Sequence, residues 1–219
     1  MLNTLNNTDL GDDHLMTNIN TPLREDAFEM PDDEKIKAIA ENFHQIMHTL
    51  GLDLNDESLK GTPLRVAKMY VKELFNGLKP ENEPGITLFE NNYEYGEMLV
   101  ERNISFYSNC EHHFVPIVGK VHVAYIANGH VIGLSKLHRI VNYYARRPQV
   151  QERLTIQIGN ALKKALNTND VAVIVDADHF CVSSRGIADQ TSSTVTTFYD
   201  GQFNNLQKRE EFMGLIKLK

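Results

Sequence analysis

The chain has 219 residues, 42% of them hydrophobic, which is enough for one folded domain with a real core and an appended subdomain. The formal charge of −7 arises in residues 1–35, which hold nine acids against Arg24 and Lys35, so the rest of the chain is balanced and offers no overall basic field for a nucleic acid. No apolar run reaches the roughly 20 residues that span a bilayer and no secretory signal pattern is visible, so we expect a cytoplasmic protein whose two cysteines are thiolates or metal ligands rather than a disulfide.

The N-terminal part of the sequence divides into an acidic arm and a helical region. Residues 1–31 are rich in Asn, Asp and Thr with little periodicity, which predicts a flexible arm with no assigned chemistry. Apolar residues three or four apart predict a helix from Asp32 to Leu50, with Asp33 as a candidate N-cap, and Thr62-Pro63 opens a second helix that ends near Asn76. We therefore expect an arm over residues 1–31, a helical region over 32–96, and a main domain with a C-terminal helix over 97–219.

The main domain shows the pattern of paired strands around two helices. Alternating side chains predict strands over residues 98–107 and 114–127, followed by a turn at Asn128-Gly129. Two helices are expected over residues 135–147 and 149–166, separated at Pro148. Residues 171–182 and 191–199 are again rich in strand-forming residues, and residues 206–218 predict a terminal helix. This order indicates an α+β fold in which an antiparallel sheet carries helices on one face.

Both cysteines lie close to histidines, which indicates a metal site. Cys110 and His113 are three residues apart, and side chains at that spacing in a strand point to opposite faces, so joint binding requires the chain to turn over residues 109–113. His179 and Cys181 are two apart in a strand-like run and would share a face, which brings both towards the same ion. Thiolate together with imidazole favours zinc over magnesium or calcium.

These four candidates allow two kinds of zinc site. Four protein ligands give a closed structural site, whereas three leave a position for water and permit catalysis. His112 is a further histidine able to transfer protons near neutral pH, and this surplus favours the open, catalytic site. The alternative, two buried and inert cysteines, is weakened because each cysteine has a histidine within three residues.

A set of basic side chains suits a polyphosphate. Ser135 is a candidate N-cap, and a helix N-terminus attracts phosphate. Lys136 and Arg139 lie on one side of the same helix, and Arg185 adds a third cation close to the metal strand. Taken alone, Lys136 and Arg139 are explained more simply as a solvated helix face. Glu152, in the first turn of the next helix, is either a favourable dipole charge or an acceptor for the N–H groups of a purine edge.

Four segments in order, residues 108–114, 131–140, 147–153 and 179–186, resemble the GTP cyclohydrolase I family, and the resemblance extends over about residues 35–219. It implies a tunnelling fold (T-fold) assembled as a homodecamer with active sites between subunits. It also implies a zinc ion held by Cys110, His113 and Cys181, with His179 outside the ligand set. The implied reaction opens the guanine imidazole ring of GTP by attack of a zinc-activated water at C8. Formate is lost and 7,8-dihydroneopterin triphosphate is formed, the first step of pterin and tetrahydrofolate biosynthesis.

The resemblance also implies roles for individual residues. His112 and His179 would carry protons to the ring nitrogens and the ribose oxygen. Glu152, with Gln151, would hold the guanine edge, and Ser135 would lie by the ribose. Four cations would bind the triphosphate: Arg65, Lys136, Arg139 and Arg185.

Two alternatives from other classes remain. A non-catalytic, zinc-stabilised module would use His179 as a fourth ligand and would not need His112. Another T-fold enzyme, acting on a pterin or a deazapurine nitrile, would use a similar Glu but a catalytic cysteine without the zinc set. One departure from the family pattern is Ser183, where the family often has Lys; it bears on triphosphate affinity and leaves the metal and proton-transfer residues intact.

Overall fold

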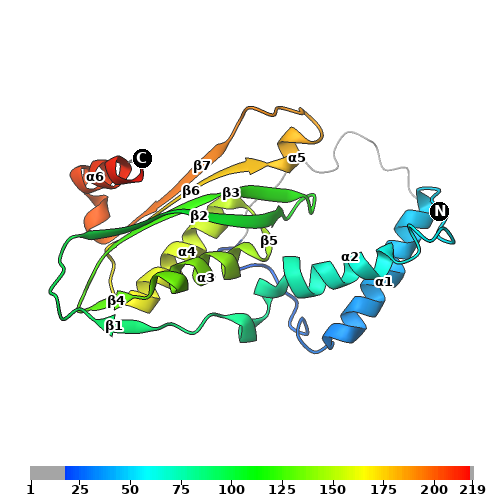
Figure 1. The fold of residues 1–219 in the computed structure, drawn as a ribbon, viewed down its shortest axis with the longest axis horizontal. Coiled ribbons are helices and arrows are strands. Elements are labelled where there is room, and N and C mark those ends of the chain that lie inside the picture. Colours follow the sequence, from blue (N-terminus) through cyan, green and yellow to red (C-terminus); the bar gives the residue numbers. More distant parts are fainter. Residues whose placement is uncertain (1–17, 218–219) are drawn as a thin grey trace.

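The computed structural model describes residues 18–217, so the arm predicted over residues 1–31 falls partly outside the described residues. The first elements are the helices α1 (Asp32–Thr49) and α2 (Thr62–Met69), which pack against each other. Figure 1 shows this pair extending away from the sheet. A π-helical turn (Tyr70–Leu74) and two short 3-10 turns (Asn76–Leu78, Pro80–Asn82) lead back towards the rest of the chain.

A five-stranded sheet forms the centre of the molecule, in the order β5-β2-β3-β6-β7. Its strands are β2 (Met98–Cys110), β3 (Pro116–Ile126), β5 (Pro148–Gln149), β6 (Val171–His179) and β7 (Thr194–Tyr199). Neighbouring strands are antiparallel except for the short β5, which runs parallel to the end of β2. A separate ribbon pairs β1 (Leu88–Glu90) with β4 (His130–Ile132), so the region expected to be helical over residues 32–96 also contains a strand.

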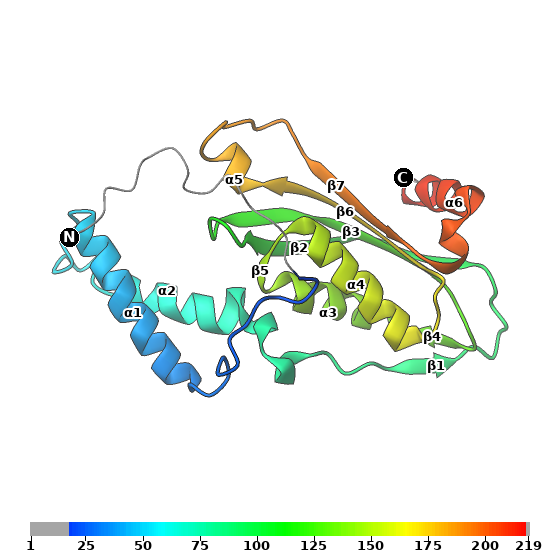
Figure 2. The ribbon, with the colours of Figure 1, turned by 180° about the vertical axis from the view of Figure 1, so that it is seen from behind.

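The two long helices, α3 (Leu134–Ala145) and α4 (Gln151–Leu166), lie together on one face of this sheet (Figure 2). Alternate residues of the strands face them, and Val121, Val123 and Tyr125 of β3 are fully buried there with Val173 of β6. Because successive strand side chains point to opposite faces, the same alternation that was visible in the sequence builds this core. The α+β class and the antiparallel pairing of the long strands are confirmed.

The prediction that helices occupy one face holds for α3 and α4 but is wrong for the C-terminal helix α6 (Leu206–Ile216). Phe212 of this helix packs with Met98, Ala124 and Ile174, which belong to the opposite face of the sheet. The reason is that the strand residues on this opposite face are also apolar, and α6 shields them from water. The last predicted helical residue, Leu218, lies outside the described residues.

Two predicted helix starts are displaced in the structure. The N-cap of α1 is Pro31 rather than Asp33, and the N-cap of α3 is Gly133 rather than Ser135. Gly133 is still extended, and the helix begins at Leu134, so Ser135 already lies inside the first turn. Neither cap residue makes a side-chain capping bond.

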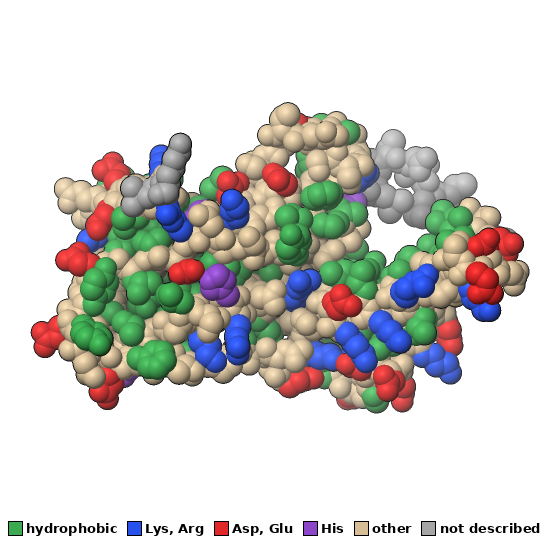
Figure 3. All heavy atoms as spheres, in the orientation of Figure 1, with side chains coloured by type: hydrophobic (Ala, Val, Ile, Leu, Met, Phe, Trp, Pro, Cys, Tyr) green, Lys and Arg blue, Asp and Glu red, His purple; other side chains and the backbone are tan. Residues whose placement is uncertain are grey.

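Charged side chains are mixed rather than segregated on the face drawn in Figure 3, where Lys and Arg alternate with Asp and Glu over the helical region. This agrees with the balanced charge of the chain beyond its acidic arm. Among the described residues, no helix combines the length and the apolar character needed to cross a lipid bilayer.

Candidate active site

A tight turn at the end of β2 carries the first metal-ligand candidates. The amide of Cys110 donates to the carbonyl of Val115 (2.8 Å), and the amide of Phe114 donates back to the carbonyl of Cys110 (2.8 Å). Phe114 adopts a left-handed conformation with φ of 55°, which reverses the chain direction. The expected turn over residues 109–113 is therefore confirmed, and it directs the side chains of Cys110 and His113 to the same side.

The second ligand segment differs from the strand that the sequence suggested. β6 ends at His179, and a single helical turn, α5 (Phe180–Ser183), begins immediately afterwards. His179 and Cys181 therefore do not share a strand face, because the change from strand to helix turns the two side chains apart. Cys181 turns to Cys110 and His113, whereas His179 bonds elsewhere.

The ligand atoms of Cys110, His113 and Cys181 all lie within 4.8 Å of one another. The Sγ of Cys110 is 3.9 Å from Nδ1 of His113. A tetrahedral zinc ion with ordinary bond lengths separates its sulfur and nitrogen ligands by about 3.6 Å and its two sulfurs by about 3.8 Å. Three soft or borderline donors at this spacing fit zinc, and they leave the fourth position open.

The electrostatics of the two free cysteines also fit a cation. Burial is the main cause that raises the pKa of the Cys181 thiol, and the charge of Cys110 is the second. The Cys181 thiol therefore resists losing its proton until a positive charge lies beside it. A metal ion would supply that charge, because thiolates rather than thiols bind metals.

Arg185 reaches this cluster from the loop after α5. Its guanidinium donates to Nε2 of His113 (3.1 Å), although the side chain of Arg185 is otherwise exposed. The chain thus places one of the predicted phosphate-binding cations beside a candidate metal ligand. Ser183, two residues earlier at the end of α5, is half-buried.

A pocket of about 370 Å³ adjoins the three-ligand cluster. It lies between the turn after β2, the start of α4 and the end of β6. Its lining includes both predicted proton-transfer histidines and both predicted base-binding residues. The full lining consists of Cys110, Glu111, His112, Ile117, Gln149, Val150, Gln151, Glu152, His179 and Cys181.

Within this pocket, the tautomer of His179 is fixed by Gln151. The Nε2 of Gln151 donates to the carbonyl oxygens of Val175 (3.1 Å) and Thr194 (2.8 Å), so its Oε1 is left as an acceptor. Nε2 of His179 lies 2.6 Å from this Oε1 and must donate to it. Burial lowers the pKa of His179, while the nearby charges of Glu152 and Asp178 oppose the shift. His179 is therefore neutral at pH 7, with Nδ1 unprotonated.

The other predicted substrate residues lie away from this pocket. Arg65, on α2, donates to the carbonyl of Ser58 (3.3 Å) and to Oγ1 of Thr62 (3.2 Å). Ser135, Lys136 and Arg139 lie in the first half of α3, whereas its last residues lead into β5 beside Cys110. A helix of 12 residues is about 18 Å long, so Ser135 and Lys136 are separated from the metal-ligand cluster by most of that length. Within the described residues, one chain supplies only part of the predicted site.

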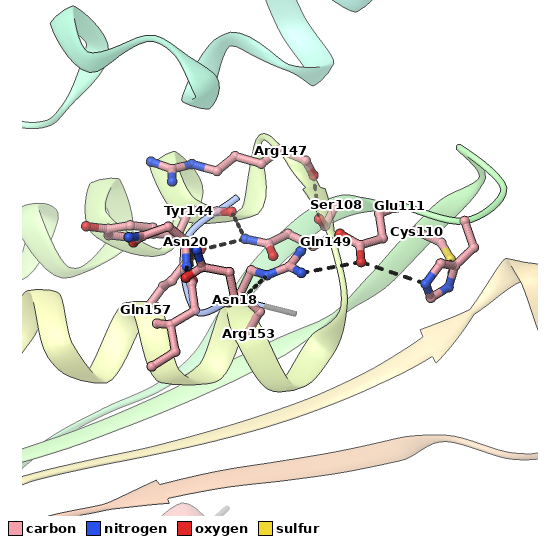
Figure 4. A network of polar contacts seen from close by, with 12 residues as sticks. Asn18, Asn20, Ser108, Cys110, Glu111, Tyr144, Arg147, Gln149, Arg153 and Gln157 are labelled. Atoms are coloured by element: carbon pink, nitrogen blue, oxygen red, sulfur yellow. Dashed lines mark hydrogen bonds and ion pairs between the residues drawn. The ribbon is translucent and has the colours of Figure 1, made fainter. Parts of the chain in front are cut away.

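Sequence reasoning missed an ion pair between a buried arginine and an acid of the pocket wall. Arg153 of α4 is 1% exposed, and its guanidinium donates to both carboxylate oxygens of Glu111, which lies between Cys110 and His112 (Figure 4). A signal existed, because Arg153 is a charged residue on the apolar stripe of a predicted helix, and such a residue is almost always paired. The sequence does not say with which acid it pairs.

Comparison with known proteins identifies the family of the chain. The family model of GTP cyclohydrolase I matches residues 39–217. The chain is 58% identical over 218 residues to GTP cyclohydrolase 1 of Flavobacterium johnsoniae, covering 98% of each chain. It is 51% identical over 204 residues to GTP cyclohydrolase 1 of Yersinia enterocolitica, covering 93% of this chain and 92% of that protein. It is also 52% identical over 200 residues to GTP cyclohydrolase 1 of Escherichia coli O1:K1, covering 91% of this chain and 90% of that protein.

Among solved structures, the apo form of the archaeosine synthase QueF-Like covers 47% of this chain and 89% of its own, with a TM-score of 0.37 and 22% identity, values too low for any conclusion to rest on them. The family match, in contrast, extends over residues 39–217, and the three sequence relatives cover 91–98% of the chain. This chain therefore belongs to the GTP cyclohydrolase I family.

Proposed function

We propose that this protein is a GTP cyclohydrolase I, which hydrolyses the imidazole ring of GTP, releases C8 as formate and forms 7,8-dihydroneopterin triphosphate at the start of tetrahydrofolate and pterin biosynthesis. The observation that carries the proposal is the pocket in which His112, His179 and Glu152 adjoin Cys110 and Cys181. It combines a metal-ligand cluster with proton-transfer groups and an acceptor for a base, within a chain of this family.

In this proposal Cys110, His113 and Cys181 hold zinc. When bound there, zinc would supply a Lewis acid that lowers the pKa of a water molecule towards neutrality. Imidazole with a metal on one nitrogen carries a proton on the other, so His113 could no longer accept the hydrogen bond from Arg185. Arg185 would then be released to bind a phosphate oxygen.

His179 and His112 move protons. His179 is held neutral by burial and donates Nε2–H to Gln151, so its Nδ1 is able to accept a proton at pH 7. His112 lies in the turn after β2 and lines the same pocket. Two histidines on one pocket allow one proton to be taken up while another is delivered.

Glu152 recognises the base. A carboxylate accepts two hydrogen bonds at once, which matches the adjacent N1–H and amino group of guanine and leaves adenine, with no N1–H, poorly paired. The side-chain amide of Gln151 is already bonded to Val175, Thr194 and His179. Gln151 therefore contributes to the base site through its backbone, while its side chain orients His179.

The remaining cations come from neighbouring subunits. Ser135 would lie by the ribose, and Arg65, Lys136 and Arg139 would bind the triphosphate together with Arg185. Homodecamer formation with active sites between subunits would bring the start of α3 of one copy to the pocket of another. Such an assembly would complete the site, because the pocket and the start of α3 lie apart within one chain.

Two surfaces support assembly into a T-fold. Within the described residues, nothing pairs with the outer edge of β7, and β5 covers only the last two residues of the outer edge of β2. Open edges of long strands are closed in stable proteins, and pairing between copies would join the sheets into a continuous barrel. An apolar pocket of about 570 Å³ beside α1, lined by Phe28, Phe43, Phe75 and Phe114 among others, gives a second surface for contact between copies.

The domain limits at residues 31/32 and 96/97 are part of the same proposal, with the catalytic T-fold domain over residues 97–219. So is a cytoplasmic location, because Cys110 and Cys181 are free and thiols persist in reducing compartments.

The experiment that tests the function is incubation of purified protein of known zinc content with GTP. Formate release and the fluorescence of the oxidised pterin product are followed in parallel. We expect both signals with stoichiometric zinc, and loss of both on chelation. Zinc without either product would instead support the non-catalytic zinc module, and formate without pterin would show ring opening that stops before rearrangement.

A further inference from the structure

Arg153 is a buried charge that holds three acceptors at once. Its NH1 and NH2 donate to the two carboxylate oxygens of Glu111, the NH2 distance being 3.4 Å. Its Nε donates to the backbone carbonyl of Asn18 (3.1 Å). Figure 4 shows the guanidinium between the segment of Asn18 and the turn that carries Glu111. Every nitrogen of this side chain is therefore engaged.

The carboxylate of Glu111 is fixed on one side by Arg153 and lies close to His112 on the other. Its Oε1 is 3.7 Å from Nε2 of His112. The backbone amide of Glu111 donates to the carbonyl of Gln149 (3.0 Å), which ties the same residue to β5. Glu111 is thus anchored through both backbone and side chain, directly before a residue that faces the pocket.

The anchor on the opposite side of Arg153 is the first described segment of the chain. Gln157, one turn further along α4, donates to the carbonyl of Ile19 (2.8 Å), next to the carbonyl that Arg153 binds. Gln157 in turn accepts from Nε2 of the fully buried Gln149 (2.8 Å). This second contact holds the Asn18–Ile19 backbone against α4 and so fixes the direction in which the guanidinium of Arg153 points.

We propose that Arg153 is a positioning residue that acts through Glu111 to hold His112 in its catalytic orientation, with the backbone carbonyl of Asn18 as the counter-anchor. This inference rests on the proposed function and adds to it an arginine that is 1% exposed and acts through Glu111, a residue of the pocket wall. The geometry matters because a lysine at position 153 keeps the charge but cannot donate to two carboxylate oxygens and to a carbonyl in fixed directions. Arg153→Lys therefore separates charge from geometry.

The test compares R153K, E111Q and the double variant with the wild-type protein. R209K is the matched control, because Arg209 also donates to a backbone carbonyl, that of Phe203 (2.7 Å), and packs on the ring of Tyr199, but it lies at the C-terminal helix. For each variant we measure zinc content, the thermal midpoint, KM for GTP and kcat from formate release. The wild-type measurement comes first: if the wild-type protein releases no formate from GTP, the proposed function fails, independently of the variants.

With active wild-type protein, we expect R153K and E111Q each to lower kcat by about tenfold while KM and zinc content stay within about twofold of the wild-type values. The double variant should lose little more than either single variant, because both changes break one unit. R209K should lower the thermal midpoint without lowering kcat. Unchanged kcat in R153K, loss of zinc in R153K, or independent, multiplying effects of the two changes would each overturn the positioning role.

Discussion

Nε2 of His179 lies 2.6 Å from Oε1 of Gln151, and the amide nitrogen of Gln151 is bonded to two strand carbonyls, those of Val175 and Thr194. These bonds fix the orientation of the amide and, through it, the tautomer of His179. A residue that the family resemblance assigned to the base thus sets the chemistry of a neighbouring histidine.

Replacing Gln151 should therefore damage proton transfer more than binding. Q151M keeps the size of the side chain but removes the acceptor for His179, so we expect kcat to fall by about tenfold to about a hundredfold with zinc content unchanged. Steady-state kinetics with metal analysis checks this. Q202M, at an exposed glutamine bonded to Asp170, is the control and should leave kcat unchanged. A rise in KM alone would show instead that the side chain of Gln151 binds the base.

Substitution of the metal ligands and of His179 should have different consequences. C181S removes one of three ligands and should lose most of its zinc and its turnover together. H179A should retain zinc and lose about 10² to 10⁴ in kcat, because the proposed role of His179 is proton transfer and the residue lies outside the ligand cluster. Metal analysis after dialysis, combined with the formate assay, distinguishes the two variants. Zinc loss in H179A would contradict a three-ligand site and favour the closed, structural one.

The stability of the fold should depend on pH through His122. Burial lowers the pKa of His122, the charge of Asp176 opposes the shift, and Lys120 and Arg102 add to it. The folded state then binds fewer protons than the unfolded state near pH 6, so stability is constant above the unfolded pKa of about 6.5 and falls as the pH drops through it. Protonation also removes the Nδ1 acceptor used by the amide of Asn103 (3.4 Å).

The measurement is the free energy of unfolding in urea at about pH 7.5 and about pH 5.5, at one protein concentration. H122N is the comparison, because its side-chain oxygen can replace Nδ1 but does not titrate. We expect a larger loss of stability on acidification in the wild-type protein than in H122N. Equal losses would show that His122 does not contribute to the acid sensitivity.

Assembly should restore activity to mixtures of inactive variants. E152Q removes the proposed base-binding carboxylate in the pocket, and R139A removes a proposed triphosphate-binding cation on α3. If neighbouring copies complete each site, random mixing leaves roughly one quarter of the sites with both halves intact. Activity after co-expression therefore returns to about that fraction of the wild-type value. Mixing E152Q with H179A, two changes on the same side, is the control and should restore nothing; failure of the first mixture would place the whole site in one chain.

Two helical glycines should respond in opposite ways to alanine. A Cβ at Gly159 of α4 would meet the ring of Phe198 of β7 at 2.4 Å, so G159A should destabilise the fold by about 1–3 kcal/mol. A Cβ at Gly214 of α6 would meet nothing within 4 Å, and alanine is the better helix former by about 0.5–1 kcal/mol. Urea unfolding of both variants at one concentration checks the signs, and a stabilising G159A would mean that β7 moves freely relative to α4.

The sequence predicted every long element, and it predicted the candidate metal ligands Cys110, His113 and Cys181 that the structure brings together. Strand alternation around Val121, Val123 and Tyr125 is visible in the sequence because it depends on neighbours two residues apart. The turn of residues 109–113 also follows from local spacing, because Cys110 and His113 cannot reach one ion in any other way. Local patterns of this kind are determined within a few residues, so the sequence shows them directly.

The predictions that needed correction concern the ends of elements and the choice of face. The strand-like run over residues 171–182 gives no sign that β6 ends at His179 and that a helical turn follows. The position of α6 depends on which face of the sheet still exposes apolar side chains after α3 and α4 have packed. Both outcomes depend on tertiary contacts rather than on local propensity.

The sequence by itself determined the ligand types, the presence of two histidines beyond the metal set, and the membership of the chain in a family. Only the tertiary structure decided that His179 pairs with Gln151, 28 residues away, and that Arg153 joins Glu111 to Asn18, 42 and 135 residues away. The physical reason is that a buried charge or amide must find a partner, but any acid or carbonyl brought near by the fold satisfies it. Residue type and spacing therefore fix the chemistry that is available, and packing selects which groups perform it.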